Sequence, residues 1–266
     1  MRKPSFITAN YVARAKGYNG EPNWGVHDQA TRDNTSADQW GFICRDVARQ
    51  GFKAIDIWTA HCHWQHHDRE GYPERVKALC VENGLEVTSY AGGIPIKKPA
   101  DLDAPLAFMN RIGAPIFAGG IHGLPVADLA PAVQDACQRH GVRWALENHP
   151  EKSADEILNK IGNGKFDRCG VALDTGWCAI QHMDALDATK RVRPSLFILH
   201  LKDVVAPGSH DTCAIGEGVV PCEQVVRYLV ETNWSGAICI EHEPYDRDPM
   251  PEVKRSLERV QQWLRA

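Results

Sequence analysis

The 266-residue sequence contains no apolar run near the roughly 20 residues that a membrane span requires. Its first residues are partly basic and have no apolar core of signal-peptide length, so we expect neither a membrane segment nor a secretory leader. An excess of positive charge is also absent: the net charge of −4 and the pI near 6.3 argue against a nucleic-acid partner. The nine cysteines are odd in number and form no C-x-x-C pair, so we expect a reduced, cytoplasmic protein.

Short β-rich segments alternate with longer amphipathic segments along the chain. We expect strands at residues 6–9, 54–58, 85–89, 115–118, 143–147, 171–174, 197–200 and 237–241. We expect helices at residues 38–50, 73–83, 102–112, 126–140, 153–161, 185–192, 222–232 and 252–264. The segment between the first strand and the first of these helices is rich in Gly, Asn and Asp, and reads as a long polar stretch.

This alternation predicts a parallel α/β fold. The two candidates are a doubly wound open sheet and a (β/α)8 barrel, which typically has about 250 residues. The barrel is favoured because no Gly-rich phosphate-binding fingerprint follows the first strand. Because no linker or internal repeat interrupts the pattern, we expect residues 1–266 to form a single (β/α)8 TIM-barrel domain.

Four of the expected strands in the second half end on a side chain that can ligate a metal. These strand ends are Glu147, Asp174, His200 and Glu241. In a barrel the C-terminal ends of the strands meet at the mouth where chemistry occurs. Three carboxylates and an imidazole gathered there would repel one another without a cation, so the set predicts a divalent metal site. Oxygen ligands with one nitrogen suit Mn²⁺ or Mg²⁺, with Co²⁺, Fe²⁺ and Zn²⁺ as alternatives.

The residues around these strand ends resemble the sugar phosphate isomerase/epimerase superfamily, the xylose-isomerase-like TIM barrels. The motifs are residues 147–150 (ENHP), 174–177 (DTGW), 200–204 (HLKDV), 216–218 (GEG) and 241–244 (EHEP). The resemblance implies a metal ion, often Mn²⁺, held by the same four strand-end residues. It further implies that the metal chelates sugar oxygens and supports removal of a proton next to a carbonyl.

One position departs from the pattern of many epimerases in this superfamily, which have a His where this chain has Trp177. With residues 10–14 (NYVAR) and 208–213 (GSHDTC), Trp177 resembles a narrower branch that contains the C-glycoside deglycosidase catalytic subunits and relatives acting on 3-keto-glycosides. The resemblance implies elimination, in which a 3-keto-sugar loses its C2 proton and expels the group at C1. We therefore expect deglycosylation of 3-keto-glycosides, with keto-sugar or sugar phosphate isomerisation or epimerisation as the alternative.

His149 is the predicted catalytic base, together with the carboxylates Glu147 and Glu241. It lies two residues beyond Glu147, on the same side of a continuing strand, and imidazole titrates near neutral pH. The alternative role for His149 is a hydrogen bond to a residue that supports the site. The predicted substrate-binding residues are Lys202, His122, Trp177 and Arg14. For Lys202, a structural ion pair is the alternative.

Two further features have weaker functional readings. The histidine-rich segment at residues 61–67 fits no defined metal-site spacing, so we expect a polar rim of the pocket there. Glu217 is expected to order its loop. An endonuclease of the same superfamily is disfavoured by the acidic pI and by missing ligands for a multi-zinc cluster. A non-catalytic sugar-binding subunit is disfavoured by the intact ligand set. The expected partners are a small sugar or keto-glycoside, and a second copy or a small partner chain.

Overall fold

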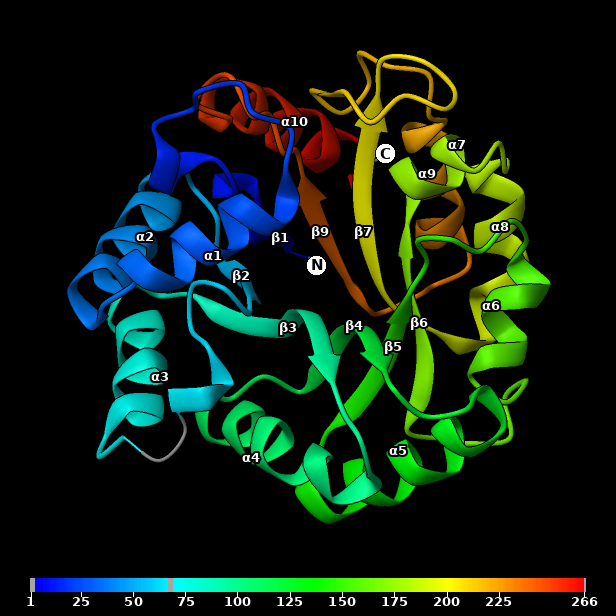
Figure 1. Ribbon diagram of the computed structural model, residues 1–266. Coiled ribbons are helices and arrows are strands. Elements are labelled where there is room, and N and C mark those ends of the chain that lie inside the picture. The colour runs from blue at the N-terminus through cyan, green and yellow to red at the C-terminus, as the bar shows by residue number, and fades with distance from the viewer. Residues whose placement is uncertain (1–2, 67–68, 266) are drawn as a thin grey trace.

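The computed structural model describes residues 3–66 and 69–265, which form a closed parallel barrel (Figure 1). Its strands run β1-β2-β3-β4-β5-β6-β7-β9, and β9 pairs with β1 to close the ring. Their bounds are β1 (Pro4–Ile7), β2 (Ala54–Trp58), β3 (Glu86–Pro95), β4 (Ile116–His122), β5 (Arg143–Glu147), β6 (Cys169–Asp174), β7 (Leu196–Val204) and β9 (Ala237–Glu241). The short β8 (Thr212–Cys213) pairs antiparallel with the end of β7. The expected (β/α)8 barrel is confirmed.

Helices form an outer ring around the strands (Figure 1). They are α2 (Ala37–Arg49), α3 (Tyr72–Glu82), α4 (Asp103–Ile112), α5 (Val126–His140), α6 (Ala154–Lys160), α8 (Ala185–Val192), α9 (Cys222–Glu231) and α10 (Met250–Trp263). All eight lie within two residues of the expected bounds. The local signals act as expected: the Ser153 hydroxyl accepts a hydrogen bond from the Glu156 amide at 3.2 Å, and Gly113 ends α4 with a left-handed φ of 82°.

The structure corrects the expectation of a long polar loop after the first strand. Helix α1 (Trp24–Asn34) lies there, with Asn23 as its N-cap. Only His27 and Thr31 of this helix are buried, so it has no apolar stripe from which it could be read. A second short helix, α7 (Thr175–Ile180), begins directly after β6 and was also not anticipated.

Buried apolar side chains lie on both sides of the strands. The larger group packs between strands and outer helices and contains bulky residues such as Trp40, Phe108 and Trp144. The smaller group, centred on the strand faces that the helices do not cover, includes several alanines: Ala91, Ala118, Ala145 and Ala172. Small side chains there leave room for large polar ones near the mouth. Eight of the nine cysteines are buried, and all nine are free thiols. Among the described helices, none has the length and apolarity to cross a bilayer.

Candidate active site at the barrel mouth

The C-terminal ends of the strands open into a cavity of about 1170 Å³. Six of the residues predicted to act in catalysis or binding line it: His122, Glu147, His149, Trp177, Lys202 and Glu241. Asp174 and His200 are fully buried beside it and do not line it. The barrel therefore brings residues from β4, β5, β7 and β9 to one opening, as their positions at strand ends predict.

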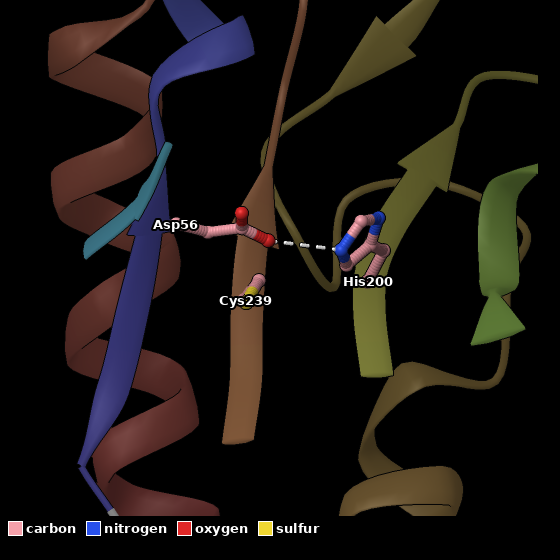
Figure 2. Close-up of side chains that lie close together, drawn as sticks. All are labelled: Asp56, His200 and Cys239. Carbon is pink, nitrogen blue, oxygen red and sulfur yellow. Dashed lines mark hydrogen bonds and ion pairs between the residues drawn. The ribbon is translucent and has the colours of Figure 1, made fainter. Parts of the chain in front are cut away.

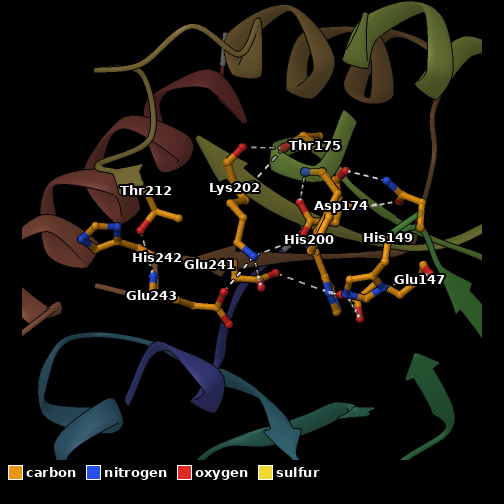
Figure 3. A network of polar contacts seen from close by, with 12 residues as sticks. Glu147, His149, Asp174, Thr175, His200, Lys202, Thr212, Glu241, His242 and Glu243 are labelled. Atoms are coloured by element: carbon orange, nitrogen blue, oxygen red, sulfur yellow. Dashed lines mark hydrogen bonds and ion pairs between the residues drawn. The ribbon is translucent and has the colours of Figure 1, made fainter. Parts of the chain in front are cut away.

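Glu147, His200 and Glu241 form the core of the site (Figure 3). The Nδ1 atom of His200 lies 2.5 Å from Glu147 Oε1 and 3.4 Å from Glu241 Oε2. One ligand-type atom from each of the three residues lies within 4.8 Å of the others. Glu241 Oε2 is buried and has no hydrogen-bond partner. A buried carboxylate oxygen without a partner is costly, so this geometry fits a cation that Glu147, His200 and Glu241 would share.

The imidazole of His200 lies between carboxylates on both of its edges. On the side away from Glu147, its Nε2 lies 3.0 Å from Oδ2 of Asp56 on β2. Burial by itself lowers the pKa of His200, but Glu147, Asp56 and Glu241 together outweigh that effect and raise its pKa well above the usual range. Asp56 was not among the expected site residues.

Lys202 is a second buried cation, set among three carboxylates (Figure 3). Its Nζ lies 2.7 Å from Glu241 Oε1, 2.8 Å from Glu243 Oε2 and 3.2 Å from Asp174 Oδ2. Burial alone lowers the pKa of Lys202, but the three carboxylates raise it well above its ordinary value. The stem of Lys202 passes against Gly176: a Cβ atom at that glycine would lie 2.5 Å from Lys202 Cγ. Gly176 thus makes room for the lysine.

Asp174 is placed differently from the other three expected ligands. Its Oδ1 accepts the Trp177 amide at 3.0 Å and caps helix α7, while its Oδ2 faces Lys202. Its backbone is held by Asn148, which donates to the Asp174 carbonyl and accepts from the Asp174 amide. The expected four-residue set is therefore divided: three residues form one close group, and Asp174 joins that group through Lys202, which also contacts Glu241.

His149 reaches the cavity from the segment that follows β5. Its Nε2 lies 3.7 Å from Glu147 Oε2, and its ring packs edge-on against Trp177 with the ring centres 4.8 Å apart. The backbone is fixed from both sides: the His149 amide donates to Glu151 at 2.9 Å, and Gln181 donates to the His149 carbonyl at 3.0 Å. His149 is therefore held beside a core carboxylate with its side chain 42% exposed to the cavity.

Two of the sequence-based expectations lie away from this cavity. Arg14 packs over the rings of Tyr11 and Phe42, 4.7 Å from each, and lines a separate pocket of about 530 Å³ instead. The histidine-rich segment does not form the expected rim: His61 and His63 are buried and absent from the cavity wall, and His61 lines the smaller pocket. Position 67 lies outside the described residues. Neither placement could be read from the sequence, because both segments leave strand ends and then turn away.

The sequence matches the xylose isomerase-like TIM barrel family over residues 44–266. The chain belongs to this family. No curated protein matches it in sequence. Solved structures with the same fold include D-allulose 3-epimerase from Methylomonas sp. (TM-score 0.72, 16% identity, 99% of each chain covered) and D-psicose 3-epimerase with D-tagatose from Clostridium cellulolyticum H10 (TM-score 0.68, 13% identity, 99% of this chain and 98% of that one). A third is the probable 3-DHS dehydratase AsbF from Bacillus anthracis (TM-score 0.66, 13% identity, 97% and 98% covered). These identities show a shared fold.

In this xylose isomerase-like barrel, the motif that follows His200 has a structural role that the sequence did not reveal. Asp203 is fully buried, and its carboxylate accepts four backbone N–H bonds of 2.9–3.0 Å, from residues 204, 216, 218 and 220. These hydrogen bonds hold the loop at residues 216–218 against β7. Glu217 in that loop pairs with Arg255 and Arg259 of α10, outside the cavity. That the chain belongs to the narrower deglycosidase branch remains a prediction.

Proposed function

We propose that the protein is a divalent-metal-dependent keto-sugar isomerase or epimerase. The observation that carries this proposal is the pair of carboxylates, Glu147 from β5 and Glu241 from β9, which both lie beside Nδ1 of His200 at the wall of one cavity (Figure 3). A reaction that removes a proton from a carbon and returns one elsewhere needs two such groups close to the same place. Among the residues that the structure describes, no other close group of potential metal ligands combines two carboxylates with a histidine.

A divalent cation fits the residues at this site. The structure places five carboxylates, those of Asp56, Glu147, Asp174, Glu241 and Glu243, around two buried cationic side chains, His200 and Lys202. The excess of carboxylates and the Glu241 oxygen that lacks a hydrogen bond favour a bound cation. Oxygen donors with one imidazole nitrogen suit Mn²⁺, the ion we propose, with Mg²⁺, Co²⁺ or Zn²⁺ as alternatives. When bound, such an ion supplies Lewis acidity to a nearby carbonyl.

The side chains of the protein would move the proton. Either Glu147 or Glu241 takes a proton from one face of the carbon, and the other returns a proton to the opposite face or to the neighbouring carbon. The Lys202 ammonium, next to Glu241, is placed to donate to an oxygen that gains negative charge. His149 and Trp177 form the adjoining wall, where Trp177 offers an apolar face to a sugar ring.

The reactions named for two neighbours of the same fold support this proposal. The Methylomonas and Clostridium proteins are 3-epimerases of ketoses, and both superpose over essentially their whole length. At 16% and 13% identity the likeness itself is one of fold. The support is therefore analogy, added to the carboxylate pair and the cation fit.

A second candidate is elimination from 3-keto-glycosides, and the size of the cavity favours it. Pockets of roughly 300–1,000 Å³ hold drug-sized ligands, and this cavity of about 1170 Å³ exceeds that range. Its wall includes three tryptophans, Trp24, Trp58 and Trp177, which suit an aromatic group attached to a sugar. In this reaction His149 would remove the proton beside the ketone and the leaving group would depart from C1. The probable dehydratase among the neighbours belongs to the same broad class of eliminations.

One experiment separates the two candidates. The protein is stripped with a chelator, reloaded with Mn²⁺, and incubated in D₂O with free ketohexoses and, separately, with a 3-keto-glucoside of a phenol. Mass spectrometry and chromatography follow the products. Isomerisation or epimerisation gives a rearranged sugar that has lost no atoms and carries deuterium from the solvent on a carbon. Elimination releases the phenol. A protein that binds Mn²⁺ and does neither contradicts both candidates.

Two variants sharpen the result. Glu241→Gln should lower turnover about 100-fold or more, because it removes one of the two proton-transfer groups. Glu217→Gln is the matched control: it changes a glutamate that pairs with arginines outside the cavity and should leave turnover unchanged. His149→Ala should retain metal under either candidate, but should abolish turnover only if the reaction is elimination.

A further inference from the structure

The Nε2 edge of His200, opposite the one that faces Glu147, is held by a buried carboxylate (Figure 2). The Nε2 atom lies 3.0 Å from Asp56 Oδ2, and both side chains are fully buried. Asp56 comes from the middle of β2, whereas His200 comes from β7, so the contact joins strands that are not neighbours in the ring. The thiol of Cys239 on β9 lies within 4.8 Å of the same pair.

Both ring nitrogens of His200 face carboxylates, Nδ1 facing Glu147 and Nε2 facing Asp56. A cation bound beside Glu147 and Glu241 would need the Nδ1 lone pair, which leaves Nε2 to donate its hydrogen to Asp56. Nδ1, which faces Glu147 and Glu241, then has its lone pair free whenever the ring is neutral. Histidines that bind metals commonly donate their other ring N–H to a carboxylate, which fixes both the tautomer and the ring orientation.

We propose that Asp56 is a positioning residue that locks His200 with Nδ1 directed at the cation site. The inference rests on the proposed cation site, and it adds a residue that touches neither cation nor substrate. The energetic cost of burying the Asp56 carboxylate supports a functional role for it. Its second oxygen, Oδ1, is buried without a hydrogen-bond partner, although an apolar side chain in this strand would avoid that penalty.

A rival reading places a second cation among Asp56, His200 and Cys239, whose ligand-type atoms also lie close together. That site would need the Nε2 lone pair of His200, which the hydrogen bond to Asp56 excludes in the neutral ring. The two readings differ in metal stoichiometry. If Asp56 positions His200, each chain binds one cation through Nδ1. If the second site exists, a cation is bound through Nε2.

The first test uses the wild-type protein loaded with Zn²⁺, which is diamagnetic. Long-range ¹H–¹⁵N spectra of the histidine rings, with His200 assigned from the resonances lost in His200→Gln, report the state of each nitrogen. The expected result is a protonated Nε2 and a metal-bound Nδ1, with one Zn²⁺ per chain. A metal-bound Nε2, or two ions per chain, overturns the proposal.

The second test measures Mn²⁺ affinity by calorimetry in Asp56→Asn. The asparagine amide can donate to Nε2 and so favour the wrong tautomer, and the expected loss of affinity is about 10–100-fold. Cys239→Ser, which changes the third member of the group and leaves the Asp56 contact in place, should bind as the wild type does. A folded Asp56→Asn with unchanged affinity overturns the proposal. A wild type that binds no metal overturns the cation site itself, and if Asp56→Asn does not fold, the wild-type spectra decide.

Discussion

Replacing Lys202 by Met should destabilise the metal-free protein and strengthen its binding of a divalent cation. The Lys202 ammonium lies 2.7–3.2 Å from oxygens of Glu241, Glu243 and Asp174, and its side chain is only 6% exposed. Methionine fills a similar volume without charge. The substitution therefore leaves three carboxylates, two of them buried, without their shared counterion, and it frees oxygens of Glu241 and Asp174 for a metal.

The expected magnitude follows from the burial of the ion group. Removing one partner of a buried ion pair typically costs about 3–5 kcal/mol, because the remaining charge is left uncompensated. A cation that restores compensation recovers this free energy on binding. Since about 1.4 kcal/mol corresponds to a factor of ten, Mn²⁺ affinity should rise by a factor between about 100 and about 4,000. Turnover should nevertheless fall, because the ammonium that would donate to the substrate oxygen is lost.

Chelator-stripped protein, studied by urea denaturation and by calorimetric titration with Mn²⁺, tests both parts of this prediction. Lys160→Met is the matched control: Lys160 lines the same cavity, but it pairs with Glu151, away from the cation site. The control should leave Mn²⁺ affinity unchanged. If Lys202→Met binds Mn²⁺ as the wild type does, or more weakly, then Lys202 does not compete with the cation for these carboxylates and the charge accounting of the site is wrong.

Three further predictions concern the elements that support the site. Asp203→Ala leaves four backbone N–H groups, two of them buried, without their acceptor and should lower the free energy of unfolding by about 3 kcal/mol or more in urea titrations; an unchanged value would mean that the loop is held by other contacts. Gly176→Ala places a Cβ 2.5 Å from Lys202 Cγ, so the melting temperature and turnover should both fall. A crystal structure of this variant in which Lys202 keeps its wild-type position would refute the prediction. The Arg255 guanidinium, with Arg259, lowers the pKa of Glu217 below 4.5, so this contribution to stability is present above that pH and is lost as pH falls through the lower folded-state value. The stability difference between wild type and Glu217→Gln should therefore shrink below pH 4.5, and a difference that grows there would contradict the pairing.

The fold and six of the residues that line the cavity were predictable because they depend on local patterns. Alternating strand and helix signals define the barrel, and the C-terminal ends of its strands meet at the mouth. Glu147 and Glu241 end β5 and β9 and met there as expected, and His200 joins them from within β7, which continues to Val204. Lys202 also lines the cavity, two residues beyond His200 on the same strand.

The remaining features depend on contacts between distant segments. The separation of Asp174 from the close group arises because α7 starts at that residue and uses its carboxylate as a cap. Arg14 turns away because Tyr11 and Phe42 hold its guanidinium. Asp56 gave one local signal, an acidic residue inside an otherwise apolar strand, but its partner is 144 residues away in sequence.

The most direct test of the central claim is the position of a bound metal. In crystals soaked with Mn²⁺, an anomalous difference map recorded at the manganese edge should show one peak per chain within bonding distance of Glu147, His200 Nδ1 and Glu241. The same peak should be absent in Glu241→Gln crystals. A peak elsewhere, or no peak at saturating Mn²⁺, would contradict the account of this site as the centre of the chemistry.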